Sequence, residues 1–389
     1  MNSGKDFEIR LNLKHRVRFT RDAFAGSNRL LDGLLETNGN AKILVFLDRA
    51  VAAAFPELES QIHDRCKRLQ GFRFTETVLI DGGEGCKRDA NTLQLAWDKM
   101  ENAGIDRHSY VFCIGGGALL DVIGFAAATC HRGLRLVRFP TTTLSQDDSG
   151  VGVKNGINAY GKKNFLGAFS VPYAVVNDFA FLFSQPEHDF RAGLVEAVKV
   201  ALVKDGDFFD WLEDNAQLLA KLKPHAVEEA VERSAMLHAA HIAYGGDPFE
   251  NGNSRPLDYG HWAAHKLEQM TEFALTHADA VSIGVALDTL YSWKCGWLDK
   301  KSAMRVLDVL KNLRLPRWHD GLDEKLADGT RKLYAGLNEF REHLGGELTV
   351  LLLQEVGRGG DAHAMDHELL DECIDYLRLL ELGELELEK

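Results

Sequence analysis

The chain has 389 residues, of which 45% are hydrophobic and 26% are charged. This is the composition of a globular protein long enough to form two domains. Its formal net charge of −13 argues against nucleic-acid partners and anionic membranes, because both require a cationic surface. An anionic substrate would therefore need a local group of positive side chains within an acidic protein.

The N-terminal segment and the cysteines predict a cytoplasmic location. The segment MNSGKDFEIRLNLKHRVRF is charged throughout and lacks the apolar core of a signal peptide. No apolar run approaches the roughly 18 residues of a membrane span. The six cysteines show no CxxC pair and no framework spacing, which is typical of reduced thiols.

The first half of the chain alternates between strand and helix patterns. Short apolar or β-rich runs predict strands at residues 42–48, 72–80, 110–114 and 137–139, and helical patterns begin at Arg49 and cover residues 91–102. Alternating units of this length predict a parallel sheet with helices on both faces. We therefore expect a Rossmann-like α/β domain over residues 1–177.

The pattern changes near residue 178, after which long helical stretches dominate. Helices are predicted over residues 190–204, 208–221, 225–244, 258–270 and 278–297, with a last one from residue 367. We therefore expect an all-α C-terminal domain over residues 178–389, and we place the metal and substrate site there. The acidic end, ELGELELEK, is typical of a solvated helix end.

A run of three glycines is the first sign of a nucleotide site. Gly115, Gly116 and Gly117 follow a predicted strand and open a helix, so the backbone amides and the helix dipole could stabilise a pyrophosphate. A plain tight turn would explain the same residues. Asp48, at the end of an earlier strand, suits a ribose hydroxyl pair, and it suits a helix N-cap equally well.

Several motifs taken together resemble one family. DGGEGCK, GGGALLDVIGFAAATCHRG, RFPTTTLSQDDSGVGVKNGIN, GKKNFLGAF, GLVEAVKVALVKD, DYGHWAAHKLE and THADAVSIG occur in order, and this series is similar to the dehydroquinate synthase family of sugar-phosphate cyclases. The resemblance implies a homodimeric carbon–oxygen lyase that depends on NAD and a metal. Such an enzyme eliminates phosphate from a ketose phosphate by redox-assisted β-elimination and closes a carbocycle by an intramolecular aldol step.

The resemblance also implies which residues bind NAD. Thr141 and Thr142 follow a proline, so a capped turn is an alternative explanation for both. The implied NAD-binding residues are Asp48, Glu84, Lys87, Gly116, Gly117, Asp121, Thr141, Thr142, Asp148, Lys163, and Phe181 and Ser184 of the segment 181–184.

The implied metal ligands are Glu196, His261 and His277. One carboxylate and two imidazoles suit Zn²⁺ or Co²⁺ and leave positions open for substrate oxygens. His265 lies four residues after His261 and shares its helical face. The resemblance assigns His265 to the substrate phosphate, although a single histidine on a helix is often structural.

A cationic set provides the local positive charge that an anionic substrate needs. By resemblance, the phosphate is held by Arg132, Lys154, Asn164 and His265. Lys199 lies one helical turn from Glu196 and is expected to face the metal site.

The segment before His261 departs from the dehydroquinate synthases. Ser254 takes the place of their arginine, with Arg255 one residue out of register, and Asp258 takes the place of their asparagine. An upstream lysine also has no match, with Ala240 or His241 in its position. Asp258 would repel a substrate carboxylate. Asp258 and the ALVKD run are similar to cyclases that act on sedoheptulose 7-phosphate, such as 2-epi-5-epi-valiolone synthases. Those enzymes usually lose the second helix histidine, whereas His265 is kept here, so the chain matches neither branch fully.

These departures favour a neutral ketose phosphate as substrate. The alternatives are an authentic 3-dehydroquinate synthase, an iron-type alcohol or glycerol dehydrogenase with the same two-domain plan, and a catalytically silent binding protein. Such dehydrogenases use an aspartate and three histidines for metal and need no phosphate clamp, so Glu196, Lys154 and Lys163 argue against that alternative.

Overall fold

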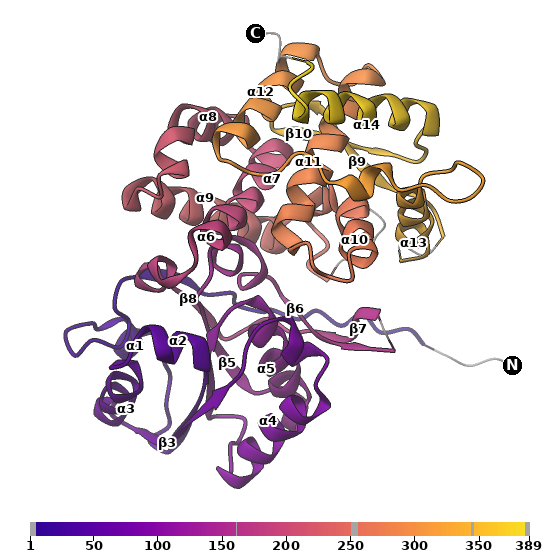
Figure 1. The fold of residues 1–389 in the computed structure, drawn as a ribbon. Helices are drawn as coiled ribbons and strands as arrows, with labels where there is room; N and C mark the ends of the chain where they lie inside the picture. The colour runs from indigo at the N-terminus through magenta and orange to yellow at the C-terminus, as the bar shows by residue number, and fades with distance from the viewer. Residues whose placement is uncertain (1–4, 161, 250–255, 344–345, 386–389) are drawn as a thin grey trace, which may run out of the picture.

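The computed structural model describes residues 5–160, 162–249, 256–343 and 346–385 (Figure 1). The first half of the chain forms an α/β part around one parallel sheet, and the second half forms a helical part above it in the view of Figure 1. The predicted fold class is therefore confirmed. The boundary at residue 177 stays a prediction; the last strand of the sheet ends at Asp178.

The central sheet has six strands in the order β1-β8-β5-β4-β2-β3, and every neighbouring pair is parallel. Its inner strands are buried on both faces, which explains why they read as continuous apolar runs rather than alternating ones. The four predicted strands are confirmed. The strands are β1 (Val17–Thr20), β2 (Ala41–Asp48), β3 (Phe72–Ile80), β4 (Tyr110–Gly115), β5 (Arg135–Pro140) and β8 (Ala174–Asp178).

Helices cover both faces of this sheet and bury two separate apolar layers. One layer is covered by α1 (Leu30–Leu34), α2 (Arg49–Ala54) and α3 (Leu58–Arg68), and the other by α4 (Ala90–Asn102) and α5 (Gly117–Thr129). The chain leaves β2 toward β3 on one side and then crosses to β4 on the other side. The carboxyl ends of β2 and β4 thus form the switch point at which nucleotides bind in open α/β sheets.

The helical half contains most of the predicted helices, with one break. The predicted helix over residues 190–204 is two helices, α6 (Glu187–Gly193) and α7 (Val195–Lys204). Gly193 packs so closely on Leu144 that a Cβ would lie 2.5 Å from the Leu144 nitrogen. The other helices are α8 (Gly206–Ala220), α9 (Pro224–Tyr244), α10 (His261–Met270), α11 (His277–Lys294), α12 (Lys300–Asn312), α13 (Ala335–His343) and α14 (His367–Glu381).

The helical half also carries a hairpin that the sequence did not predict. β9 (Val350–Glu355) and β10 (Arg358–Ala362) form a two-stranded antiparallel sheet. The first four residues of β9 are buried in the helical core. A short apolar run of this kind cannot be distinguished from a buried helical segment by its periodicity.

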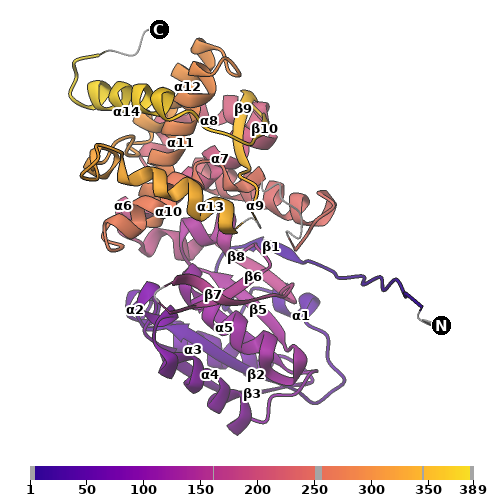
Figure 2. The same cartoon turned by 90° about the vertical axis from the view of Figure 1, so that its right-hand side faces the viewer.

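A second hairpin lies between the two halves. β6 (Lys154–Ala159) and β7 (Lys162–Phe169) pair antiparallel and form a sheet of their own. Figure 2 shows this hairpin between α5 and the helical half. β6 packs on α5, where a Cβ on Gly124 would collide with the side chain of Asn155.

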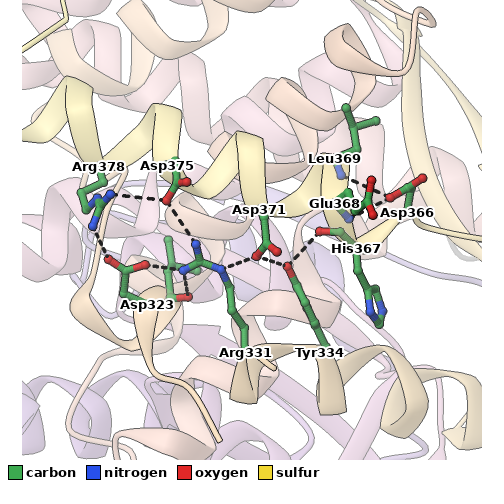
Figure 3. A network of polar contacts seen from close by, with 11 residues as sticks. Asp323, Arg331, Tyr334, Asp366, His367, Glu368, Leu369, Asp371, Asp375 and Arg378 are labelled. Atoms are coloured by element: carbon green, nitrogen blue, oxygen red, sulfur yellow. Dashed lines mark hydrogen bonds and ion pairs between the residues drawn. The ribbon is translucent and has the colours of Figure 1, made fainter. Parts of the chain in front are cut away.

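A polar network fastens α14 to the turns that precede α13 (Figure 3). The guanidinium of Arg331 is only 4% exposed and pairs with three carboxylates, those of Asp323, Asp371 and Asp375. Tyr334 Oη lies 2.6 Å from Asp371 Oδ1. Every Arg331 nitrogen thus has a partner, so the buried charge is compensated.

No helix in the described part of the chain is long and apolar enough to cross a membrane. All six cysteines are free, and four of them are buried. Burial raises the pKa of the Cys66 thiol to about 12, so this side chain stays protonated and unreactive.

Candidate active site

Glu196, His261 and His277 come together in the helical half. Each offers a ligand atom, and these atoms lie within 4.8 Å of one another. Glu196 stands in the first turn of α7, while His261 and His277 are the first residues of α10 and α11. Three helix starts therefore converge on one point.

A close contact between α10 and α11 sets the spacing of the two histidines. Gly260 precedes α10 with φ +79°, and a Cβ there would lie 2.6 Å from the Val285 nitrogen. A Cβ on Gly284 of α11 would collide with the carbonyl oxygen of Gly260. The absence of side chains at both positions lets the two helices, and with them the two imidazoles, approach closely.

Each of the two imidazoles has a hydrogen-bond partner at Nδ1. His261 Nδ1 lies 3.1 Å from the Tyr259 carbonyl oxygen, and His277 Nδ1 lies 3.0 Å from Glu268 Oε2. An acceptor at Nδ1 requires a proton there, which leaves Nε2 of each ring free to bind a metal.

The carboxylate of Glu196 is available to bind a metal. It is 1% exposed, and apart from its ion pair with Lys199 neither oxygen has a hydrogen-bond partner among the described residues. Burial raises the pKa of Glu196, and burial together with Lys199 lowers the pKa of His261 well below its ordinary value. A neutral imidazole and an unsatisfied carboxylate are what a divalent metal would bind, so the residues fit a metal.

Lys199 and Asp148 join the two halves beside this cluster. Lys199 Nζ lies 3.7 Å from Asp148 Oδ1, and His238 Nδ1 of α9 lies 2.9 Å from the same oxygen. Burial alone would lower the pKa of Lys199, but the carboxylates of Asp148 and Glu196 raise it above its ordinary value. Lys199 is therefore a fixed positive charge.

His265 lies at the same place but is exposed. Its ring centroid lies 5.4 Å from that of His261 and 5.9 Å from that of His277. Its nitrogens, a carboxylate oxygen of Glu268 and the His277 nitrogens also lie within 4.8 Å of one another, which makes a second set of potential ligands that shares His277. The position of His265 suits an anion approaching from solvent.

The glycine run lies at the switch point of the sheet, as its sequence context predicts. Gly116 caps α5 without any side-chain hydrogen bond, so the first amides of the helix face an uncapped end. A Cβ on Gly116 would lie 3.3 Å from Thr142, and one on Gly117 would lie 2.7 Å from Ser149 Oγ. Side chains at these two positions would crowd Thr142 and Ser149, so glycine keeps the space beside the helix N-terminus open, which fits a bound pyrophosphate.

Asp48 and the two threonines already have structural roles. The Asp48 carboxylate accepts a hydrogen bond from the Ala50 nitrogen and caps α2. Thr142 Oγ1 accepts from the Ser145 nitrogen at 3.2 Å, and Thr141 is buried. The capping explanation therefore holds for Asp48 and Thr142, although Asp48 also lies at the carboxyl end of β2 where a ribose would bind.

Three of the motifs meet at one buried lysine. Lys87 Nζ lies 2.6 Å from Asp121 Oδ2 and donates to Asn164 Oδ1. Glu84, one turn earlier, accepts from the side-chain amide of Asn158 at 2.8 Å. The two acids, the lysine and the β6–β7 hairpin thus form a single polar network beside the start of α5.

The other charged side chains predicted for the site come from both halves of the molecule. Lys163 of β7 donates to Glu268 Oε1 of α10 at 2.5 Å. Asp258 lies near enough to Lys199 and His265 to influence the pKa of both. Lys154, at the start of β6, is exposed and lies near His241 of α9. Ser254 and Arg255 lie outside the described residues.

Arg132 is exposed after the end of α5, and its role in phosphate binding stays a prediction. Two other predicted residues make contacts within the α/β half. Phe181 is 3% exposed and packs on Phe55 in the core. Ser184 Oγ donates to the Phe181 carbonyl oxygen within its own turn.

Three residues at the site were not predicted. Glu268 could have been found from HWAAHKLE, since positions i, i+4 and i+7 share one helical face. Asp147 is fully buried with neither carboxylate oxygen partnered in the described structure, and burial and Glu196 raise its pKa well above the usual range. Neither Asp147 nor His238 gives a sequence signal, because both depend on packing between distant elements.

Comparison with known proteins agrees with this arrangement. Residues 77–192 match the family model for the 3-dehydroquinate synthase N-terminal region, and residues 193–333 match the model for its C-terminal region. The 3-dehydroquinate synthase of Pseudomonas putida is 36% identical over 69% of this chain and 77% of its own length. That of Halorhodospira halophila is 33% identical over 84% of this chain and 89% of its own length.

Solved structures share the fold along nearly the whole chain. The 2-epi-5-epi-valiolone synthase ValA from Streptomyces hygroscopicus subsp. jinggangensis 5008, with NAD⁺ and Zn²⁺ bound, superposes with a TM-score of 0.84 at 26% identity, covering 96% of this chain and 99% of that one. A 2-deoxy-scyllo-inosose synthase gives a TM-score of 0.72 at 19% identity, covering 92% of this chain and 96% of its own. An iron-containing alcohol dehydrogenase from Corynebacterium glutamicum gives 0.60 at 15%, covering 95% and 97%; the last two likenesses show the fold alone.

Proposed function

The chain belongs to the 3-dehydroquinate synthase family and is a phosphate-eliminating cyclase, and from this premise we propose that its substrate is a neutral ketose phosphate, such as sedoheptulose 7-phosphate. NAD and a divalent metal, Zn²⁺ or Co²⁺, are its cofactors. ValA, whose structure holds NAD⁺ and Zn²⁺, supports this assignment.

The observation that carries the proposal is the position of Asp258. Its carboxylate lies close enough to Lys199 and His265 to influence the pKa of both side chains. A substrate carboxylate placed there would meet a like charge in a partly buried site, which costs free energy. Hydroxyl groups would instead donate hydrogen bonds to Asp258, so a polyhydroxylated, uncharged end of the sugar fits this position.

The opposite end of the substrate carries phosphate and needs positive charge. We assign this role to His265, Lys154 and Asn164, which lie on α10, β6 and β7. Asn164 accepts from Lys87 through Oδ1, which leaves its side-chain nitrogen to donate to a phosphate oxygen. Arg132, which is exposed after the end of α5, stays a predicted member of this set.

The remaining residues would orient the substrate and hold charge. When bound, the metal supplies a Lewis acid and the nicotinamide supplies reversible hydride transfer. Lys199 Nζ, held protonated by Asp148 and Glu196, stabilises negative charge that develops on a substrate oxygen beside Glu196. Burial of His261, Glu196 and Lys199 excludes water from this side of the site.

Phosphate release by the purified protein tests the substrate. The protein is incubated with NAD and Zn²⁺ or Co²⁺, and with either sedoheptulose 7-phosphate or the carboxylate-bearing dehydroquinate precursor. We expect release from the neutral sugar at least about 10-fold faster. Equal release would count against the proposal, and release from the precursor alone would overturn it. Steady accumulation of NADH with a simple alcohol would point instead to a dehydrogenase.

Asp258→Asn sharpens this test. Removing the negative charge should reduce the ratio of the two phosphate-release rates, neutral sugar over carboxylate-bearing precursor, by about 10-fold. One unfavourable charge contact is worth about 1.4 kcal/mol or more, which corresponds to this factor. The matched control is Asp207→Asn, an exposed acid in the first turn of α8, which should leave the preference unchanged. The predicted homodimer stays a prediction that light scattering can check.

A further inference from the structure

Glu268 contacts both Lys163 of the β6–β7 hairpin and the predicted metal ligand His277. It is neither one of the three assigned metal ligands nor one of the residues assigned to the substrate phosphate. It lies on α10, and its side chain is 4% exposed. Oε1 accepts from Lys163 Nζ at 2.5 Å, and Oε2 lies 3.0 Å from His277 Nδ1. Both oxygens of one buried carboxylate are therefore used, one by each half of the molecule.

The partner on each side has a defined role. His277 is the metal ligand at the start of α11, and an acceptor at Nδ1 fixes its tautomer and ring orientation. Lys163 stands on β7, next to Asn164, in the hairpin that packs on α5. Figure 1 shows β7 and α10 in different halves of the molecule.

The surroundings of Lys163 reinforce the contact. Its Nζ lies 5.8 Å from the centroid of the Phe273 ring, just beyond α10, and the guanidinium of Arg88 lies 4.6 Å from the same ring. Arg88 follows Lys87, which binds Asn164. The hairpin and the segment around Arg88 thus reach the helical half at the same place, through Glu268 and Phe273.

We propose that Glu268 is a positioning residue that couples the β6–β7 hairpin to the metal site, so that placement of Lys163 on α10 and metal binding through His277 strengthen each other. The inference rests on the metal role of His277 and does not depend on which sugar phosphate is the substrate. Coupling between two binding events is reciprocal. A ligand that orders the hairpin therefore tightens metal binding by the same factor by which metal binding tightens that ligand.

Metal affinity of the full-length protein, measured without substrate or NAD, provides the test. Zn²⁺ dissociation constants are determined by competition with a chromophoric chelator. Glu268→Ala should weaken Zn²⁺ binding by about 10- to 100-fold, the usual effect of removing the partner of a ligating histidine. Glu268→Gln keeps an acceptor for His277 and should recover part of that loss.

Lys163→Met separates coupling from simple orientation of the ring. In the wild-type background it should weaken Zn²⁺ binding several-fold, and in the Glu268→Ala background it should have no further effect. Equal effects in the two backgrounds, or wild-type affinity in Glu268→Ala, would overturn the proposal. Glu339→Gln, which breaks the Lys266–Glu339 pair on the outer side of the same helix, is the matched control and should not change the affinity.

Two further measurements exclude trivial explanations. Thermal unfolding of each metal-free variant shows whether the protein is folded, and the Co²⁺ absorption spectrum of Glu268→Gln should shift as the His277 ring reorients. Glu196→Ala must lose metal binding in the same assay. Retained binding there would refute the metal assignment itself, whereas an unexpected sugar preference would leave the Glu268 result intact.

Discussion

Two buried clusters of opposite charges lie in the helical half, and they differ in one respect. Around Arg331, each guanidinium nitrogen has an acceptor, and Tyr334 adds a further contact to Asp371. Around Glu196, the buried Asp147 carboxylate has no hydrogen-bond partner in the described structure, and the buried Glu196 carboxylate has only its ion pair with Lys199 there. The first cluster stabilises the packing of α14. The second leaves carboxylate oxygens available to a ligand, which lowers the stability of the protein.

The largest expected effect separates the two clusters by function. Glu196→Gln should lower turnover by at least about 1,000-fold, equivalent to about 4 kcal/mol of transition-state stabilisation, and should abolish metal binding. The free energy of unfolding of the metal-free protein should fall only slightly, because Lys199 keeps Asp148 as a partner after Glu196 loses its charge. Metal analysis, steady-state kinetics and denaturant unfolding check this; marked destabilisation would refute the contrast.

Arg331→Met should give the converse result. It leaves three carboxylates around an apolar side chain, so we expect a loss of about 3 kcal/mol in the free energy of unfolding, with turnover of the folded enzyme unchanged. Lys332→Met, which removes an exposed pair with Glu324, is the matched control and should cost little. An Arg331 variant of wild-type stability would show that the network is not structural.

A smaller effect should depend on pH, because cations crowd the side of the site formed by α9. Burial, together with Lys204, His238 and Lys154, lowers the pKa of His241 to about 4. The unfolded chain takes up this proton below about pH 6.5, whereas the folded protein does not until about pH 4. Stability should therefore fall as the pH decreases between these values, by about 1–2 kcal/mol after allowance for partial exposure.

His241→Gln should remove that part of the acid sensitivity. The difference in unfolding free energy between pH 7 and pH 4 would be smaller in the variant than in the wild type. His225→Gln, at the exposed start of the same helix, serves as the comparison. An unchanged pH dependence in His241→Gln would mean that other groups carry the effect.

The smallest effect tests one contact of the Arg331 network. Tyr334→Phe removes the hydroxyl beside Asp371 and the His367 carbonyl but keeps the ring, which stacks on His367 at 4.2 Å. We expect a loss of about 1 kcal/mol in the free energy of unfolding. Urea denaturation measures it, and a loss as large as that of Arg331→Met would show that the network cannot be divided.

The sequence predicted those parts of the fold that repeat a local pattern. The predicted strand over residues 72–80 and the predicted helix that begins near residue 225 agree with the structure to within a residue. β1, β8 and the two hairpins were not predicted, because short strands are specified by partners distant in the chain. The break at Leu194 was missed for the same reason, since it follows from packing of Gly193 against Leu144.

In the candidate site, too, some residues could be assigned from the sequence and others depend on the packing of distant segments. The family resemblance led to Glu196, His261 and His277, and the fold brings ligand atoms of these three residues within 4.8 Å of one another. Asp258 lies near enough to Lys199 to influence its pKa, and its role toward the substrate stays a prediction. Glu268 and Asp147 could not be assigned roles from sequence, because their roles depend on what lies opposite them.

The contact between Gly260 and Gly284 has a consequence for how this site tolerates change. Neither residue offers an atom to metal, cofactor or sugar, yet any side chain at either position would push apart the two helices that begin with His261 and His277. In a mutational scan, these two positions should therefore be as intolerant as the ligands themselves. A backbone approach this tight also leaves the imidazole spacing little freedom to adapt, so the choice of ion is restricted by main-chain geometry as well as by the chemistry of the donor atoms.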